Sequence, residues 1–386
     1  MREKITSAIF ASILVVFFLL VMVFPKDEMA SVQENRPLAK MPEVSLKNIF
    51  AGSFTTDYET YLTDNVGFRS HFVNFGTKIE NARGIQRKES GRIIDLANGG
   101  KLVLNDGKIM EVFKKNPDAR ESYISVLNDY AKNLDANMYL MLVPTQIEFD
   151  ESKYRLLSDS EKETIDAVYS SLKGIKTVNV YDKLKANTND YIYFKTDHHW
   201  TQRGAYLGYE AIMEKTGGNA VPLESLTHQK LSGFLGYLYN QANVPEYSKY
   251  ADDIEYFEGD ENYFILAKGP DENGEIVDYQ SKIYCPPSGS APPLYSTFMG
   301  GDHAFAKVAT NVKNGKTALI IKDSYANAVI PLLTNNYEKL IIIDPRSYYG
   351  TMSDLTAEYK FDDCIIINYV FTSTATDYIN NLERIK

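Results

Sequence analysis

Five short apolar runs constrain the fold of this chain more than any other feature of its sequence. They span residues 138–144, 177–182, 316–324, 339–345 and 363–370. Continuous runs of β-branched residues are typical of strands that are buried on both faces of a sheet. Helical patterns that precede or separate several of these runs span residues 117–134, 158–174, 203–215 and 325–334. This alternation predicts an α/β fold with a parallel sheet flanked by helices.

Composition limits the class of protein and its partners. The chain has 386 residues, of which 44% are hydrophobic and 24% are charged, as expected for a globular protein with a substantial core. Its formal net charge is −10, and no run of Lys and Arg forms a local basic patch. Binding to nucleic acid is therefore not expected.

The N-terminus carries an uncharged apolar run, residues 5–24, which follows Arg2 and Lys4 and ends at Pro25. Its length matches a helix that spans a bilayer. Residues 1–25 are therefore expected to be an N-terminal membrane anchor, with a cleaved signal peptide as the alternative. Both alternatives place the rest of the chain outside the cytoplasm, at the cell surface or secreted.

Three further segments are expected after the anchor. Residues 26–90 indicate a polar strap and N-terminal helices, with Phe72, Phe75 and Ile79 on one helical face. Residues 91–386 are expected to form the main domain, which contains the alternating strands and helices. Within it, the Tyr-rich segment of about 228–300 has the pattern of an insertion or small subdomain. It is rich in Tyr, Gly, Asp and Asn and contains short possible strands, unlike the alternation around it.

The chain has two cysteines, Cys285 in a Pro-rich stretch and Cys364 in an apolar run. An exported protein could bridge them, but one pair gives no disulfide framework, and two unrelated structural thiols are the simpler interpretation.

Ser324 stands where an apolar strand pattern gives way to a helical one, in "ALIIKDSYANAVIPLL". Such a turn lies at the carboxyl edge of a parallel sheet, where the active sites of open α/β folds occur. Amides at the start of the following helix could stabilise an oxyanion. Because serine is a weak nucleophile at neutral pH, it needs a base within hydrogen-bond reach. A helix N-cap is the alternative role for this serine.

A candidate base lies in "DHHW", residues 197–200, which holds two of the five histidines and the single tryptophan. Asp197 and His199 are two residues apart, so in an extended segment their side chains point the same way. Asp197 can then orient His199 as a general base for Ser324. His198 is expected to point away from them, and Trp200 to pack beside the base.

A metal site is a second interpretation of the same residues. Carboxylate and imidazole groups are ligands for Zn, Mn or Fe, and Asp302 and His303 in "GGDHAF" could complete the set.

The motif 197–200, followed by "GAYLGYEAIM", resembles the signature of the bacterial DHHW family. Members of that family are exported or membrane-anchored, and they are related to the periplasmic alginate O-acetyltransferases, which resemble SGNH hydrolases. Further blocks match in order, so that the resemblance spans about residues 31–370: they are residues 34–42, 64–72, 298–304, 320–333 and 341–348. The resemblance implies an SGNH hydrolase-like parallel sheet flanked by helices.

Carried onto this sequence, the resemblance implies that Asp197, His199 and Ser324 form a catalytic triad, in agreement with their chemistry. It implies that an acetyl group passes through an acetyl-serine to a sugar hydroxyl or to water. No cofactor and no metal enter this expectation. One departure is Lys322, which stands where GDSL-type esterases have glycine.

Five further residues are expected near the triad. The turn at Gly300 and Gly301 could supply an oxyanion-hole amide, with a plain tight turn as the alternative. Tyr325, Arg346 and Trp200 are expected to line the substrate site.

Three functions remain open from the sequence. The first is an O-acetyltransferase that modifies a cell-surface or secreted polysaccharide, supplied by a multi-pass membrane acyltransferase whose involvement is implied by the resemblance. The second is a carbohydrate esterase with the same triad. The third is a non-catalytic scaffold of the cell envelope. Tyr-rich loops in 237–295 fit a carbohydrate groove because aromatic faces stack on sugar rings.

Overall fold

The structure, a computed structural model, describes Met41, Val44 and residues 53–64, 91–96, 99–259, 264–270, 276–289 and 291–386. The chain divides into two compact units, one of residues 1–89 and 239–248 and the other of residues 90–238 and 249–386. The first unit contains α4 (Ser53–Asp64), within the segment expected to be helical. The expected anchor, 1–25, and Phe72, Phe75 and Ile79 lie outside the described residues. In the part of the chain that is described, no helix is long and apolar enough to cross a membrane.

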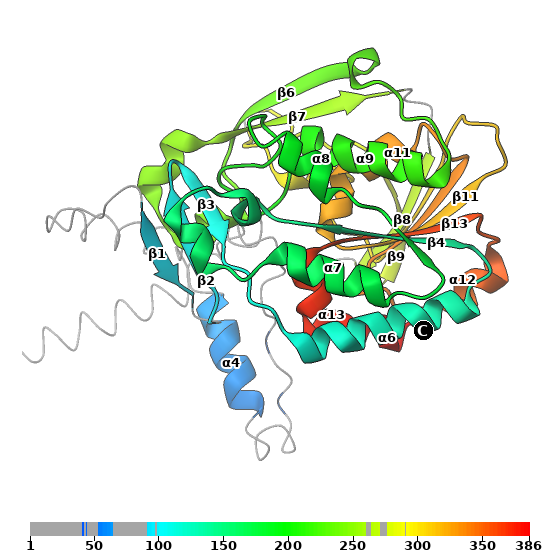
Figure 1. The fold of residues 1–386 in the computed structure, drawn as a ribbon, viewed down its shortest axis with the longest axis horizontal. Coiled ribbons are helices and arrows are strands. Elements are labelled where there is room, and N and C mark those ends of the chain that lie inside the picture. Colours follow the sequence, from blue (N-terminus) through cyan, green and yellow to red (C-terminus); the bar gives the residue numbers. More distant parts are fainter. Residues whose placement is uncertain are drawn as a thin grey trace, which may run out of the picture. The chain divides into compact units, whose positions relative to one another are not determined.

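The second unit is built around an eight-stranded sheet (Figure 1). Its strands, in spatial order, are β5 (Ile175–Thr177), β4 (Asn137–Val143), β13 (Asp363–Tyr369), β11 (Thr317–Lys322), β12 (Lys339–Ile343), β10 (Phe305–Ala309), β8 (Phe264–Pro270) and β9 (Ile276–Ser281). The first five strands are parallel. The last three add to the sheet by antiparallel pairing, so the expectation of a parallel sheet holds for one part of a mixed sheet.

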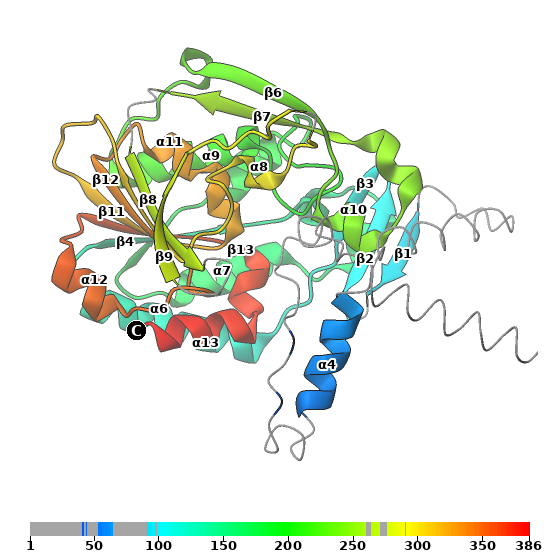
Figure 2. The ribbon, with the colours of Figure 1, turned by 180° about the vertical axis from the view of Figure 1, so that it is seen from behind.

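Helices cover both faces of this sheet (Figures 1 and 2). One face carries α6 (Pro117–Asn133), α7 (Glu161–Ser171), α12 (Met352–Glu358) and α13 (Thr376–Arg384). The other carries α8 (Tyr181–Ala186), α9 (Gln202–Thr216) and α11 (Ile330–Leu333).

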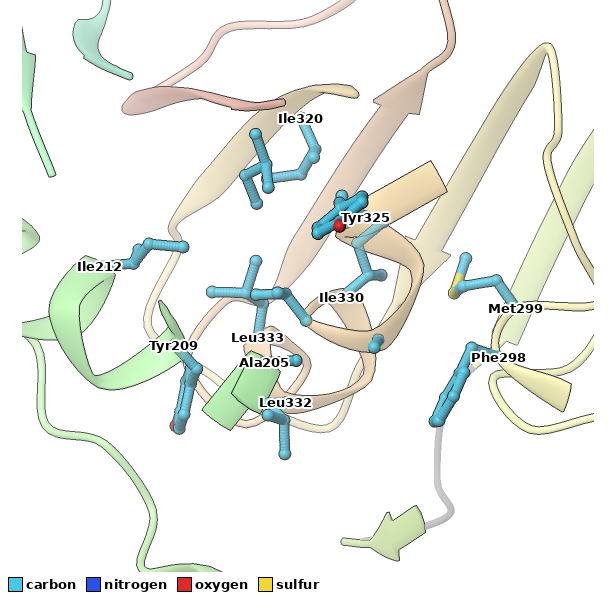
Figure 3. Packing of buried hydrophobic residues seen from close by; sticks show 14 of the residues in the cluster. Ala205, Tyr209, Ile212, Phe298, Met299, Ile320, Tyr325, Ile330, Leu332 and Leu333 are labelled. Carbon is cyan, nitrogen blue, oxygen red and sulfur yellow. The ribbon is translucent and has the colours of Figure 1, made fainter. Parts of the chain in front are cut away.

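Alternate residues of the central strands supply the two cores. Ile320 and Ile342 belong to the cluster that includes α9 and α11, while Leu319 and Ile341 belong to the cluster that includes α6 and α13. The period of two in a strand sends successive side chains to opposite faces. Figure 3 shows the α9 side of the core, where Ala205, Tyr209 and Ile212 of α9 lie around the helical segment after β11. Burial on both faces explains the uninterrupted apolar runs of the sequence.

The segment 228–300 does not form one insertion. Its strands β6 (Thr227–Phe234) and β7 (Asp252–Glu258) pair with each other, whereas β8 and β9 extend the main sheet. Three strands form a separate antiparallel sheet: β1 (Arg92–Asp95), β2 (Lys101–Asn105) and β3 (Lys108–Glu111). A further α-helix among the described residues is α10 (Tyr237–Ala242).

Two sequence ranges fold differently from their patterns. Only Ile175–Thr177 forms a strand where 177–182 was expected, and α8 starts at Tyr181. The helix expected over 325–334 is a 3₁₀ helix, Ser324–Ala328, followed by the four-residue α11, which has Pro331 in its first turn. A proline is tolerated there because its missing amide would have no partner within the helix.

Candidate active site

Ser324 is held at the carboxyl edge of the parallel strands by its neighbour Asp323. One carboxylate oxygen of Asp323 accepts the amide of Tyr325 at 2.9 Å, as an N-cap does. The other accepts the amide of Tyr369 at 2.9 Å and the hydroxyl of Thr372 at 2.7 Å. Burial raises the pKa of Asp323 to about 6, although the Thr372 hydrogen bond acts in the opposite direction. Asp323 thereby ties the end of β11 to the end of β13.

Asp197 and His199 lie in a tight hairpin of residues 191–201. Tyr193 and Trp200 form an antiparallel bridge, and the Thr201 amide donates to the Ile192 carbonyl at 3.0 Å. Within the hairpin, Asp197 Oδ1 accepts the His199 amide at 2.9 Å. A turn closed by an Asp side chain is a common local structure. It brings the carboxylate and the imidazole to the same side.

The three candidate residues form a continuous chain of hydrogen bonds. Ser324 Oγ lies 2.8 Å from His199 Nε2, and His199 Nδ1 lies 2.6 Å from Asp197 Oδ1. A carboxylate can only accept, so we assign the ring proton to Nδ1, which leaves Nε2 to accept the serine proton. Asp197 and His199 are buried, and Ser324 is half-buried. The arrangement can deprotonate a serine hydroxyl and hold the protonated imidazole that results.

Asp197 is fixed in its ionised form. Burial would raise its pKa, but the charges of His199 and His198 and the hydrogen bond from His199 outweigh burial and hold the pKa well below its usual range. Its second oxygen accepts the amide of Tyr237 at 2.7 Å. Both oxygens of this carboxylate therefore accept hydrogen bonds, Oδ1 from His199 and Oδ2 from Tyr237.

The sequence predicted an extended segment with His198 pointing away from the relay, and this prediction is wrong. Its ring centroid lies 3.8 Å from that of His199, with the planes tilted by 36°. Because the Asp197 turn folds the segment back, neighbouring side chains share one side. Burial and then the charge of His199 lower the pKa of His198 to about 4, so His198 is neutral at neutral pH. Its Nδ1 is buried and has no hydrogen-bond partner among the described residues.

Tyr295 belongs to the site but was not identified from the sequence. Its ring stacks on His199 with centroids 3.7 Å apart and planes within 7°, and its hydroxyl donates to the Ser324 carbonyl at 3.1 Å. It therefore fixes the plane of the base and the position of the nucleophile together. The stretch around it, "PPLYST", carries no motif or periodicity that would have marked it.

Trp200 and Tyr325 brace the site from inside the core. Both are fully buried. The Trp200 indole donates to the Tyr325 carbonyl at 2.9 Å, and the Tyr325 hydroxyl donates to the His198 carbonyl. They join the loop after β11 that carries Ser324, the nucleophile loop, to the hairpin of residues 191–201 that carries His199, the base hairpin. Their burial keeps them away from the surface that a substrate would meet.

An ionic cluster lies under the nucleophile loop. Buried Lys322 pairs with Asp302 and Asp344, and Arg346 pairs with the same two carboxylates. Asp302 also accepts from the Asn327 amide group at 2.9 Å. Burial would raise the pKa of Asp302, but Lys322 and Arg346 lower it far below its usual range. Lys322 therefore fills the place of the expected glycine with a paired charge, and the 43% exposed side chain of Arg346 lies at the surface of the cluster.

Gly300 and Gly301 form a tight turn next to this cluster. Their φ angles are +78° and +107°, which glycine adopts at low cost. The Gly301 amide donates to the Phe298 carbonyl at 3.2 Å. To serve an oxyanion, that amide would have to leave its present acceptor. The plain-turn interpretation describes the observed geometry.

The possible metal ligands divide into separate groups. Atoms of Asp197, His198 and His199 lie within 4.8 Å of one another and could hold a metal ion. Asp302 is held in the ionic cluster, and His303 contacts the Tyr279 hydroxyl at 2.6 Å and the Met299 carbonyl at 2.6 Å. A metal on the first group would compete with the hydrogen bond from His199 to Asp197, because both use the same carboxylate.

Comparison with solved structures shows which proteins share this fold. The structure resembles a DHHW family protein from Eubacterium siraeum at 26% identity and TM-score 0.64, over 75% of this chain and 97% of that one. It resembles Bacillus cereus PatB1 with a sulfonyl adduct at 19% identity and TM-score 0.63, over 75% and 98%. The O-acetyltransferase domain of Pseudomonas putida AlgJ matches at 11% identity and TM-score 0.40, over 76% and 99%.

No curated protein matches the chain. The family model described as DHHW protein matches residues 96–343, which contain the base hairpin, the Gly-Gly turn and Ser324. The match covers more than half of the sequence and contains all three members of the hydrogen-bonded relay. This chain therefore belongs to the DHHW protein family.

Proposed function

We propose that this protein is an extracytoplasmic O-acetyltransferase that moves an acetyl group, through an ester on Ser324, to hydroxyls of a cell-surface or secreted polysaccharide. The observation that carries the proposal is the hydrogen-bonded relay from Ser324 through His199 to Asp197. Membership of the DHHW family and the fold shared with PatB1 support it.

The geometry supports two half-reactions. In the first, Ser324 Oγ attacks the acetyl carbonyl of a donor ester while its proton moves to His199 Nε2. The tetrahedral intermediate collapses, the leaving oxygen takes that proton, and acetyl-serine remains. In the second, a sugar hydroxyl gives its proton to His199 and attacks the acetyl-serine. The acetylated sugar leaves and Ser324 regains its proton.

Each residue that holds the relay has a part in these steps. Asp197, kept ionised, stabilises the protonated form of His199 that exists between the proton transfers. Tyr295 keeps the imidazole in the plane that points Nε2 at Ser324. Water would complete the second step in place of a sugar, which is the esterase alternative, so the rate with and without sugar separates the two activities.

The test is a search for the acetyl-enzyme. The full-length chain in detergent is mixed with an activated aryl acetate, and its intact mass is measured. Ser324→Ala and His199→Ala run beside it, with Ser170→Ala, an exposed position on α7, as the matched control. We expect one acetyl adduct in wild type and control and none in the two relay variants. An adduct that persists in Ser324→Ala would refute the proposal.

The acceptor distinguishes the remaining activities. A transferase releases aryl alcohol faster when a sugar is added and yields an acetylated sugar, whereas an esterase does neither. Metal analysis of the purified chain, together with the effect of a chelator on adduct formation, tests the metal interpretation of residues 197–199. A scaffold forms no adduct in any variant.

We also propose that the apolar run 5–24 holds the protein at the membrane, near a multi-pass acyltransferase that supplies acetyl groups. The length of this uncharged run supports this location, and residues 1–25 lie outside the described part of the structure. Fractionation of cells that express the chain tests it: recovery in the soluble extracellular fraction would favour a cleaved signal peptide instead.

A further inference from the structure

A cavity lies at the same edge of the sheet as Ser324. Its volume is about 280 Å³, and its lining comes from the end of β4 and from residues 188–195. Gln146 lies three residues after the end of β4, Ser324 lies two residues after the end of β11, and β13 lies between these two parallel strands. Two inter-strand spacings therefore separate β4 from β11, which is roughly 10 Å across the sheet.

The cavity and the base belong to one rigid hairpin. Tyr191, Tyr193 and Lys195 line the cavity, and the chain turns two residues later at Asp197. The carboxylate of Asp252 accepts the amides of Lys195 at 3.0 Å and of Thr196 at 2.8 Å, which holds the stem of the hairpin in place. A ligand in the cavity would therefore sit at a defined position relative to His199.

The lining calls for a ligand that both donates and accepts hydrogen bonds. Gln146 lines the cavity, and its Oε1 is buried with no hydrogen-bond partner among the described residues, so rotation of this amide towards the cavity would let a ligand donor satisfy it. Asp150 and Asp190 are further acceptors, and Lys108 and Lys195 are donors. Hydroxyl groups satisfy both kinds of partner.

The aromatic walls offer ring surface rather than hydroxyls. The Tyr191 hydroxyl donates a hydrogen bond to Asp252 at 2.7 Å, and the Tyr193 hydroxyl donates one to the Pro144 carbonyl at 2.6 Å. Phe149 stands beside Tyr193, with ring centroids 6.3 Å apart. Ring surface beside hydrogen-bonding groups suits a sugar, which has an apolar face and a polar edge.

Charge and size narrow the class of ligand. The two carboxylates disfavour a phosphate or another polyanion, and the four charged groups disfavour an apolar ligand. A volume of about 280 Å³ lies at the small end of ligand sites, so one ring fits rather than a long segment.

We propose that this cavity is a sugar-binding subsite, which holds one ring of the polysaccharide acceptor while a neighbouring ring presents its hydroxyl to the acetyl-serine. The inference rests on the proposed function and specifies where its acceptor binds. Binding energy at this remote ring would position the reacting ring. An acceptor longer than one sugar is then bound more tightly than a monosaccharide.

The test separates sugar binding from chemistry. The Ser324→Ala full-length chain, which cannot form the ester, is titrated in a calorimeter with tetramers of β-1,4-linked glucose, glucosamine and N-acetylglucosamine, and with each monosaccharide. We expect at least one tetramer to bind, with a Kd lower than that of its monosaccharide by tenfold or more.

Two pairs of variants, made in the same background, locate the binding. Gln146→Met removes the buried acceptor and is expected to raise the Kd of the tetramer five- to tenfold. Its matched control, Gln280→Met, lies on β9 at the far end of the sheet and leaves the Kd unchanged. Lys108→Gln changes a half-buried donor of the cavity and is expected to raise the Kd two- to fivefold. Its control is Lys339→Gln, an exposed position at the start of β12.

The outcomes are decisive for the subsite. If Gln146→Met sharply lowers the temperature midpoint of unfolding, the comparison of Lys108→Gln with Lys339→Gln decides the test. Failure of every tetramer to bind, or equal binding in cavity variants and controls, overturns the subsite. Absence of an acetyl adduct in the chain that keeps Ser324, measured without sugar, overturns the proposed function instead. The failure of the subsite and the failure of the function are therefore distinguishable.

Discussion

At the scale of single residues, the site depends on how His199 is held. Asp197 bonds one ring nitrogen and the amide of the same residue, Ser324 meets the other nitrogen, and Tyr295 covers a face of the ring. An imidazole held on three sides keeps one tautomer and one orientation, which is what a general base requires. His198 lies against the same ring and is neutral at neutral pH.

Tyr295 can be tested by separating its ring from its hydroxyl. Tyr295→Phe keeps the stack on His199 and loses the hydrogen bond to the Ser324 carbonyl, so we expect the rate of acetyl-enzyme formation to fall less than about tenfold. Tyr295→Leu loses the flat ring, and a shift of the base by about 1 Å would lower the rate about 100-fold. Rapid-quench mass measurement checks both. Equal rates in the two variants would show that the Tyr295 ring does not position His199.

His198 should make stability depend on pH. Its folded-state pKa of about 4 lies below the ordinary value of 6.5, so between these values the unfolded chain binds a proton that the folded chain does not. The resulting stability is complete above about pH 6.5 and is lost as the pH falls towards 4. Urea unfolding at pH 7 and pH 4 should show that wild type loses up to about 3 kcal/mol more than His198→Asn. Glu111, Asp197 and Asp323 face His198, and His198 in turn acts on Glu111 and Asp197, so the difference reports the titration of His198 together with its effect on these two carboxylates. Parallel losses in the two proteins would contradict the shift.

At the scale of elements, the base hairpin is packed against α9 with little space between them. A Cβ atom at Gly204 would lie 2.3 Å from the Ile192 carbonyl oxygen, which belongs to the hairpin. One at Gly208 would lie 2.8 Å from the Trp200 ring. The helix therefore uses its two glycines where the hairpin backbone and the indole approach it. Packing of α9 against the hairpin sets the position of His199 from outside the site.

The Gly204→Ala variant tests this close approach. In an exposed helix, alanine in place of glycine stabilises by about 1 kcal/mol. Here the added methyl would meet backbone that cannot rotate away, and we expect a loss of about 1–3 kcal/mol in the free energy of unfolding. Denaturant unfolding measures it, with Lys215→Ala, an exposed position on the same helix, as the control. A stabilised Gly204→Ala protein would show that the hairpin can move aside.

At the scale of the whole molecule, the central strands β11 and β13 together hold the half of the site that carries Ser324. β11 positions Ser324, and the amide of Tyr369 at the end of β13 donates to Asp323, which fixes the loop after β11. Cys364 lies in β13 and is fully buried, whereas Cys285 is half-buried, and both are free thiols. The sequence left a disulfide between them open, and the structure has none.

Thiol labelling should therefore report on the opening of the whole unit. Burial raises the pKa of both thiols, that of Cys364 more strongly. Because Cys364 is in a central strand, its exposure requires unfolding of the core, and we expect it to react with iodoacetamide at least about 100-fold more slowly than Cys285. Peptide mapping after timed labelling measures both rates. Comparable rates, or a mass gain of two hydrogens on reduction, would contradict this description.

Particular residues show which parts of the fold and of the site the sequence predicts. The apolar runs of β4, β11, β12 and β13 determined the parallel half of the sheet, since burial on both faces leaves an unbroken signal. Asp197, His199 and Ser324 were also identifiable, because their chemistry needs those side chains at a strand end and in a tight turn. The sequence could not show that β8, β9 and β10 extend the sheet by antiparallel pairing. Nor could it show that Tyr295 covers the base or that Lys322 is paired beneath the nucleophile. Those contacts join residues that lie far apart in the chain, and only packing of the complete fold brings their side chains together.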